Sequence, residues 1–145
     1  MSSFGILRSK QYKNRRCNER TRKKKKIMIY DKNNIFAKIL RGEIPCKKIF
    51  ENDYVLSFHD INPQKKIHAL VIPKGEYVDL DDFNQKASDK EITEFYKAVS
   101  HVSSLLGVKD KGYRVLSNIG SDGGQEVPHL HFHIFAGEKI GRMVA

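Results

Sequence analysis

Two short apolar runs, at residues 54–59 and 67–72, predict two strands in the middle of the chain. The five residues between them, Asp60-Ile61-Asn62-Pro63-Gln64, place asparagine and proline where turns favour them, so we expect an antiparallel pair. Residues 49–50 and 113–118 have the same apolar character, which predicts two further strands.

Helical spacing first occurs near the start of the chain. A short helix is predicted from residue 35 to residue 40, with Asn33 or Asn34 as its N-cap and with Gly42 and Pro45 ending it. The apolar residues expected to share one face are Ile35, Phe36, Ile39 and Leu40.

The strongest helical pattern follows an acidic connection. Ser88 and Glu91 form a capping box, and Gly107 marks the end of the helix. Steps of three and four residues relate Ile92, Phe95, Tyr96, Val99, Val102, Leu105 and Leu106. The connection before it contains Asp79, Asp81 and Asp82. One face of this helix is therefore expected to cover a sheet.

The order of these elements predicts the fold class. Two strands, a long helix and two more strands joined by short turns favour an α+β layer structure with an antiparallel sheet. A chain of 145 residues fits one domain, which we place at residues 28–145, after a separate segment at residues 1–27.

Half of the histidines lie in one short segment, GGQEVPHLHFHIFAG, at residues 123–137. There, His129, His131 and His133 alternate with Leu130, Phe132 and Ile134. On a strand, the three imidazoles would share one face, roughly 7 Å apart along the chain, and the apolar residues would face the core.

Three interpretations of this histidine row compete. The first interpretation is a structural role, which is usual for a single histidine on a strand. It would require three neighbouring histidines to be buried or exposed together without a function. Zinc can bind histidines two positions apart, but it needs more ligands, and the first and third histidines of a straight strand lie about 13 Å apart. Neutral imidazole is also a good nucleophile toward phosphorus, and a neighbouring ring can protonate a leaving group. We favour this third interpretation.

The loop before the histidines supports it. Residues 119–125 contain three glycines, so backbone N–H groups can turn toward an anion. Gln125 adds a side-chain donor at the end of this loop. A glycine-rich loop directly before three histidines therefore indicates a site for phosphate.

The net charge of +10 belongs to the start of the chain. Residues 1–26 carry eleven Lys or Arg and one acid, and residues 27–145 carry sixteen charges of each sign. The first 27 residues have too little apolar content to fold and are predicted to be a disordered basic arm. Three hypotheses stay open for it: binding nucleic acid, acting as an organellar presequence, or lying upstream of a true start at Met28.

The cysteines and the hydropathy of the chain indicate the cellular compartment in which we expect the protein. Cys17 and Cys46 are too far apart in sequence to suggest a disulfide framework or a CxxC metal site. No apolar run approaches the roughly 18 residues that cross a bilayer, and the basic arm contains no hydrophobic segment of the signal-peptide kind. We expect a cytoplasmic protein without membrane association.

The motif His-x-His-x-His with its surroundings resembles the histidine triad (HIT) family. Residues 35–74, IFAKILRGEIPCKKIFENDYVLSFHDINPQKKIHALVIPK, are similar to the front half of its Hint branch, and YRVLSNIGSDGGQEVPHLHFHIFAG is similar to the back half. The resemblance implies a five-stranded antiparallel sheet with two helices and a homodimer. The short C-terminus, which lacks tryptophan, resembles bacterial members.

The resemblance also implies roles for four histidines. His131 would attack the α-phosphorus and form a nucleotidyl-histidine, which water hydrolyses. His133 would contact the phosphate and assist the leaving group. His129 would help to hold the tautomer of His131, and His68 would buttress the triad.

A second set of residues would bind the nucleotide. Asp60 would accept hydrogen bonds from the ribose hydroxyls. The base and sugar would be enclosed by Phe36, Ile39, His59 and Ile61, and the phosphate would be held by Asn118, Gln125 and the backbone of Val127. From the residues alone, Asp60 can also cap a turn, Asn118 can also end a strand, and Phe36 and Ile39 can also be core residues.

The resemblance thus implies a hydrolase that cleaves the P–N bond of purine nucleoside phosphoramidates. The alternatives are hydrolysis of dinucleoside polyphosphates, nucleotidyl transfer, and a nucleotide-binding regulatory or scaffold protein. Some family members carry a cysteine zinc site near the first helix, but Asn34 and Ala37 occupy that neighbourhood here. We therefore expect neither a metal nor a cofactor.

Overall fold

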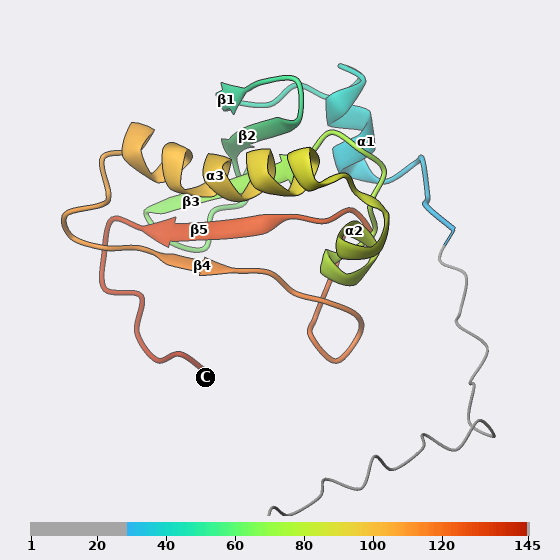
Figure 1. Cartoon of the computed structure of the whole chain (residues 1–145). Coiled ribbons are helices and arrows are strands. Elements are labelled where there is room, and N and C mark those ends of the chain that lie inside the picture. Colours follow the sequence, from blue (N-terminus) through green and yellow to red (C-terminus); the bar gives the residue numbers. More distant parts are fainter. Residues whose placement is uncertain (1–28, 145) are drawn as a thin grey trace, which may run out of the picture.

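A computed structural model describes residues 29–144, which form one antiparallel sheet with three helices. The strands are β1 (Lys48–Glu51), β2 (Val55–His59), β3 (Ile67–Pro73), β4 (Arg114–Leu116) and β5 (Phe132–Ala136). They lie in the order β1-β2-β3-β5-β4, and every neighbouring pair is antiparallel (Figure 1). The predicted fold class is confirmed. The predicted basic arm lies outside the described residues.

The helices are α1 (Ile35–Leu40), α2 (Leu80–Lys86) and α3 (Asp89–Leu105). Asn34 caps α1, and the capping box of Ser88 and Glu91 starts α3, as the sequence predicts. Gly107 follows α3 with a φ of 68°, a left-handed conformation that favours glycine.

The helix α2 was not predicted, because its sequence was assigned to an acidic connection. Its N-cap is Asp79, whose side chain accepts a hydrogen bond from the backbone N–H of Asp82. This Asp-x-x-Asp spacing is a capping signal. The helix is hard to predict from sequence because it is short and contains few apolar residues. One detail of α1 also differs: Ile35 is 42% exposed and does not share the buried face of Phe36.

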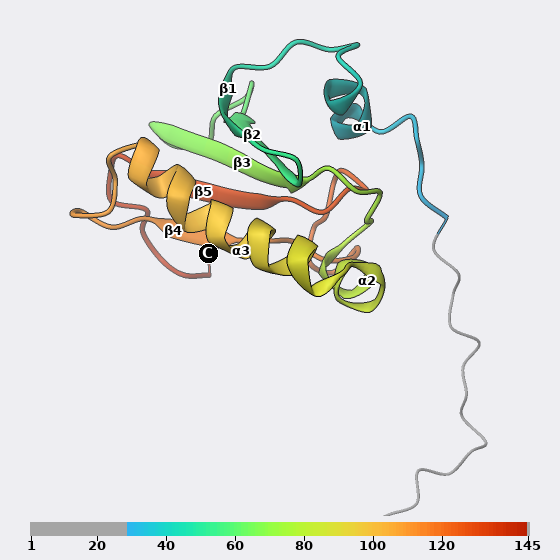
Figure 2. The ribbon, with the colours of Figure 1, turned by 45° about the horizontal axis from the view of Figure 1, so that its top comes forward.

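The two faces of the sheet bury different cores. The core under α3 contains Val55 and Val71 from the sheet together with Phe95 and Val102 of the helix. The opposite face packs against α1, and its core consists of Phe36, Leu56, Phe58, Leu70 and Ile72. Successive residues of β2 and β3 alternate between these cores, because strand side chains point to opposite faces. Figure 2 shows α3 along one face of the sheet.

The strand β5 starts later than the sequence predicts. Its ladder with β3 ends at the pair Val71 and Phe132, so His129 and His131 precede the strand. Pro73 lies two residues beyond Val71 on β3 and has no N–H to continue the ladder. The N–H of Leu130 donates to the carbonyl of Tyr77 instead. The apolar residues still face the core under α3, and the histidine rings lie on the α1 side.

Within residues 29–144, no helix is both long enough and apolar enough to cross a membrane.

Candidate active site

His131 sits just before β5 with its ring almost entirely buried. Its Nδ1 lies 2.6 Å from the backbone carbonyl of His129. A carbonyl oxygen only accepts hydrogen bonds, so Nδ1 must carry the proton of the neutral ring and Nε2 must carry the lone pair. Burial lowers the pKa of His131, so the ring is neutral near pH 7. The arrangement presents a nucleophilic nitrogen.

The ring of Phe36 contributes to this burial. It meets the ring of His131 edge-on, with the centroids 4.9 Å apart. The hydroxyl of Ser117 donates to the backbone carbonyl of His131 at 2.9 Å and so fixes the chain on its other side. Both contacts come from elements distant in sequence, and the sequence predicted neither.

His133 is paired with His68 from β3. The backbone N–H of Gln64 donates to Nδ1 of His68 at 3.1 Å, so the proton of the neutral His68 ring lies on Nε2. That Nε2 lies 2.9 Å from Nδ1 of His133, which therefore accepts. The proton of His133 then lies on its own Nε2. The two neighbouring rings thus present a lone pair on His131 and an N–H on His133, with centroids 4.9 Å apart.

His129 is fully buried, and both of its ring nitrogens are used. Nε2 donates to the carbonyl of Pro73 at 2.9 Å, and Nδ1 accepts from the hydroxyl of Tyr30 at 2.6 Å. The resemblance implied that His129 holds the tautomer of His131, and the group in contact with that ring is the carbonyl of His129 rather than its imidazole. Tyr30 was not predicted, because it lies outside every motif of the sequence.

The pKa values of His129 and His133 are lowered to about 4. Burial is the main cause, and repulsion from neighbouring histidines is a smaller one. In the unfolded chain both groups titrate near 6.5, so between these values the unfolded chain binds more protons. We therefore expect the free energy of unfolding to decrease as pH falls from about 6.5 to about 4, by on the order of 2–3 kcal/mol for each of the two histidines. Urea unfolding at pH 7, 5.5 and 4.5 measures this, and an unchanged midpoint would contradict it.

Asp60 follows β2 and faces His68. One carboxylate oxygen lies 3.5 Å from Nε2 of His68, and the other accepts the backbone N–H of Asn62 at 2.8 Å. Asp60 therefore caps a turn and also meets the histidines. Its neighbours His59 and Ile61 are exposed, and Ile61 is 93% exposed. Their expected contact with the base and sugar stays a prediction.

The apolar residues expected around the base lie in the core under α1. Phe36 is 6% exposed, and Ile39 and Val127 are partly buried against the same cluster. Asn118 is half-buried two residues beyond β4. Phe36 thus belongs to the core and also touches His131. Its expected contact with the base stays a prediction.

The amide of Gln125 is used within the glycine-rich loop. Its nitrogen donates to the carbonyls of Val78 and Val127 at 2.7 and 3.0 Å, and its oxygen accepts the N–H of Gly120 at 3.2 Å. In this structure Gln125 therefore shapes the loop, and a direct bond from its side chain to phosphate requires one of these contacts to break. The predicted phosphate contact stays a prediction.

Asp60, His68 and His133 are close enough to be considered as a metal site, with their candidate ligand atoms within 4.8 Å of one another. The hydrogen bond from the backbone N–H of Gln64 opposes this. To bind a metal through Nε2, the neutral His68 would have to move its proton to Nδ1, directly against that N–H. The contacts of His68 therefore favour a hydrogen bond from its Nε2 to His133 over binding of a metal ion.

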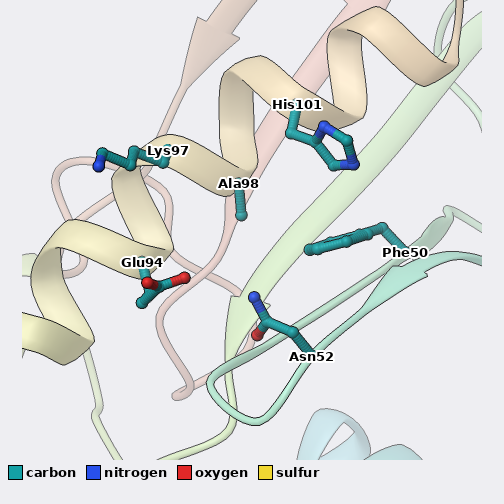
Figure 3. A pocket seen from close by; sticks show the side chains of 6 residues that line it. All are labelled: Phe50, Asn52, Glu94, Lys97, Ala98 and His101. Atoms are coloured by element: carbon teal, nitrogen blue, oxygen red, sulfur yellow. The ribbon is translucent and has the colours of Figure 1, made fainter.

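The opposite side of the molecule has a hollow of its own, of about 330 Å³. It lies between β1 and α3 and is lined by Phe50, Asn52, Glu94, Lys97, Ala98 and His101 (Figure 3). The ring of His101 packs edge-on against Phe50 at 4.7 Å. Phe50 and Ala98 belong to the core under α3, so this hollow is separated from the histidine row by the sheet.

The fold and the histidine geometry define a small α+β protein whose sheet presents an imidazole lone pair beside an imidazole N–H. The family model described as "HIT domain" matches residues 41–140. A HIT-like protein of Azospirillum brasilense is 57% identical over 115 residues, which cover 79% of this chain and 94% of that protein.

Solved structures agree. A histidine triad protein from Clostridium difficile is 42% identical, with a TM-score of 0.69 over 79% of this chain and 98% of that one. A HIT family hydrolase from Clostridium thermocellum is 33% identical, with a TM-score of 0.72 over 79% of this chain and 99% of that one. The chain belongs to the HIT domain family.

Proposed function

We propose that this protein is a Hint-like hydrolase of bacterial type that cleaves the P–N bond of purine nucleoside phosphoramidates. The observation that carries the proposal is the hydrogen bond from Nδ1 of His131 to the carbonyl of His129, because it leaves Nε2 free as a nucleophile. Similarity to a protein described as a HIT family hydrolase supports hydrolysis as the reaction class.

The first half of the reaction forms a bond from Nε2 of His131 to the α-phosphorus while the P–N bond breaks. The departing amine keeps the bonding electron pair and takes a proton from Nε2 of His133. His133 acts here in its doubly protonated form, which the anionic phosphate of the bound substrate favours, and the transfer leaves the ring neutral. The hydrogen bond that His131 donates to a carbonyl favours the positive charge that this ring gains on becoming nucleotidylated. His68 orients His133 for this transfer through their 2.9 Å contact.

In the second half, water attacks the same phosphorus. The N–P bond to His131 breaks, its electron pair returns to Nε2, and a proton of the attacking water goes to His133. A nucleoside monophosphate is released and both rings return to the protonation states in which they began the cycle, so the cycle needs no metal or other cofactor.

For the nucleotide, we assign the ribose hydroxyls to the carboxylate of Asp60, which accepts hydrogen bonds well. The base is assigned to the apolar border formed by Phe36 and Ile39, with the exposed side chains of His59 and Ile61 closing over it. Asn118, Gln125 and the backbone of Val127 are assigned to the phosphate.

A direct assay tests the reaction. The full chain is incubated in parallel with an adenosine phosphoramidate and a diadenosine polyphosphate, and samples are quenched in denaturant for peptide mass spectrometry. We expect faster turnover of the phosphoramidate and one nucleotidyl group on the peptide that contains His131. Preference for the polyphosphate would make P–O cleavage the main reaction, and absence of any nucleotidylated histidine would contradict the mechanism.

A further inference from the structure

The chain upstream of α1 reaches the candidate active site through Tyr30. The hydroxyl of Tyr30 lies 2.6 Å from Nδ1 of His129, and the two rings meet edge-on with centroids 5.6 Å apart. Nε2 of His129 donates to the carbonyl of Pro73, so Nδ1 has the lone pair and Tyr30 must be the donor. The direction of this hydrogen bond is therefore fixed by its neighbours.

His129 depends on this donor because its side chain is inaccessible to solvent. The residue is 0% exposed, so water cannot replace the tyrosine hydroxyl without rearrangement. A buried ring nitrogen without a hydrogen-bond partner destabilises the folded state. If the tyrosine hydroxyl were removed, the ring of His129 would therefore turn, shift or change its tautomer. Burial raises the pKa of Tyr30, so its hydroxyl keeps its proton and stays a donor.

The residue that Tyr30 holds is also the residue that holds the nucleophile. The backbone carbonyl of His129 receives the Nδ1 proton of His131 at 2.6 Å. With Tyr30 on one ring nitrogen and Pro73 on the other, the side chain of His129 is tethered at both ends, and its peptide carbonyl is held in place with it.

We propose that Tyr30 is a positioning residue for the nucleophile, acting through His129 on the orientation and tautomer of His131. The proposal rests on the proposed function for its catalytic part. Tyr30 itself does not touch the nucleotide and does not take part in proton transfer.

The test is Tyr30→Phe in the full chain, which keeps the aromatic packing and removes only the donor. We expect kcat for an adenosine phosphoramidate to fall about tenfold, the size expected for one buried hydrogen bond, while AMP affinity changes less than about twofold. In a His129→Asn background, the same substitution should cause no further loss, because the contact is already gone. The matched control is Tyr96→Phe on α3, where Tyr96 is 73% exposed, and it should leave kcat unchanged.

Nitrogen NMR of the histidine rings separates positioning from packing. In the unmodified protein, His129 and His131 should show Nε2–H and Nδ1–H tautomers respectively, and in Tyr30→Phe the Nδ1 signal of His129 should move toward that of a free acceptor. An Nδ1–H tautomer of His129 in the unmodified protein would overturn the proposal, and so would unchanged kcat and unchanged ring signals in the variant. If the protein has no phosphoramidase activity, the proposed function fails, and the signals of His131 in the variant still decide whether Tyr30 positions it.

Discussion

Replacing His131 by asparagine is expected to lower turnover of an adenosine phosphoramidate by about a thousandfold or more, because it removes the nucleophile. Asparagine can still donate an N–H to the carbonyl of His129 and is smaller than histidine, so the surrounding core should be kept. AMP affinity, measured by calorimetry, should change by less than about tenfold, since the groups proposed to bind the ribose and the base remain.

The matched control is His101→Asn, which changes an exposed histidine on α3 on the other side of the sheet. This variant should retain full activity. Substantial turnover by the His131 variant, with its unfolding midpoint unchanged, would remove His131 as the nucleophile. If the asparagine variant loses both activity and folding, His131→Gln replaces it, and its turnover and unfolding midpoint are measured in the same way.

Replacing Phe95 by alanine is expected to destabilise the domain by about 3–5 kcal/mol, as other truncations of buried aromatic residues do. Phe95 is 2% exposed in the core under α3, and its ring meets those of Phe83 and Phe132 edge-on at 5.3 and 5.1 Å. Phe132 begins β5, so this cluster also supports the strand that carries His133.

Urea unfolding at neutral pH measures the effect. The neighbouring residue on the same helix provides the control: Tyr96 is 73% exposed, and Tyr96→Ala should change stability by less than about 1 kcal/mol. Equal losses in the two variants would mean that α3 does not bury the face that carries Phe95. The periodicity also placed Tyr96 and Leu105 among the apolar positions of this helix, but they are 73% and 53% exposed.

The sequence predicted the long helix and most of the sheet because their signals are local. The helix α3 has a capping box at Ser88 and a left-handed glycine after its last turn, and each involves only a few neighbouring residues. The same kind of signal is present at Asp79, but α2 has only two apolar residues, Leu80 and Phe83, and so shows no repeat from which a helix could be predicted. The start of β5 was misplaced because it depends on Pro73, a residue of the partner strand.

In the candidate site, too, some features follow from local sequence and others depend on residues that are distant in the chain. The motif indicated which histidines matter, and the family resemblance gave each of them a role. The protonation pattern came from groups that no local pattern connects to the motif, namely the backbone N–H of Gln64, the carbonyl of Pro73 and the hydroxyl of Tyr30. Gln125 was predicted as a phosphate donor from its position beside the glycines, and its hydrogen bonds within the loop become visible only when the loop is folded.

By itself, the sequence indicated the fold class and the histidines that alternate with apolar residues, because alternation in an extended chain sends neighbouring side chains to opposite faces. Only the tertiary structure decided which ring nitrogen of each histidine carries its proton. A neutral imidazole can hold its proton on either nitrogen, and the choice depends on donors and acceptors that folding brings from residues 30, 64 and 73 to residues 129–133.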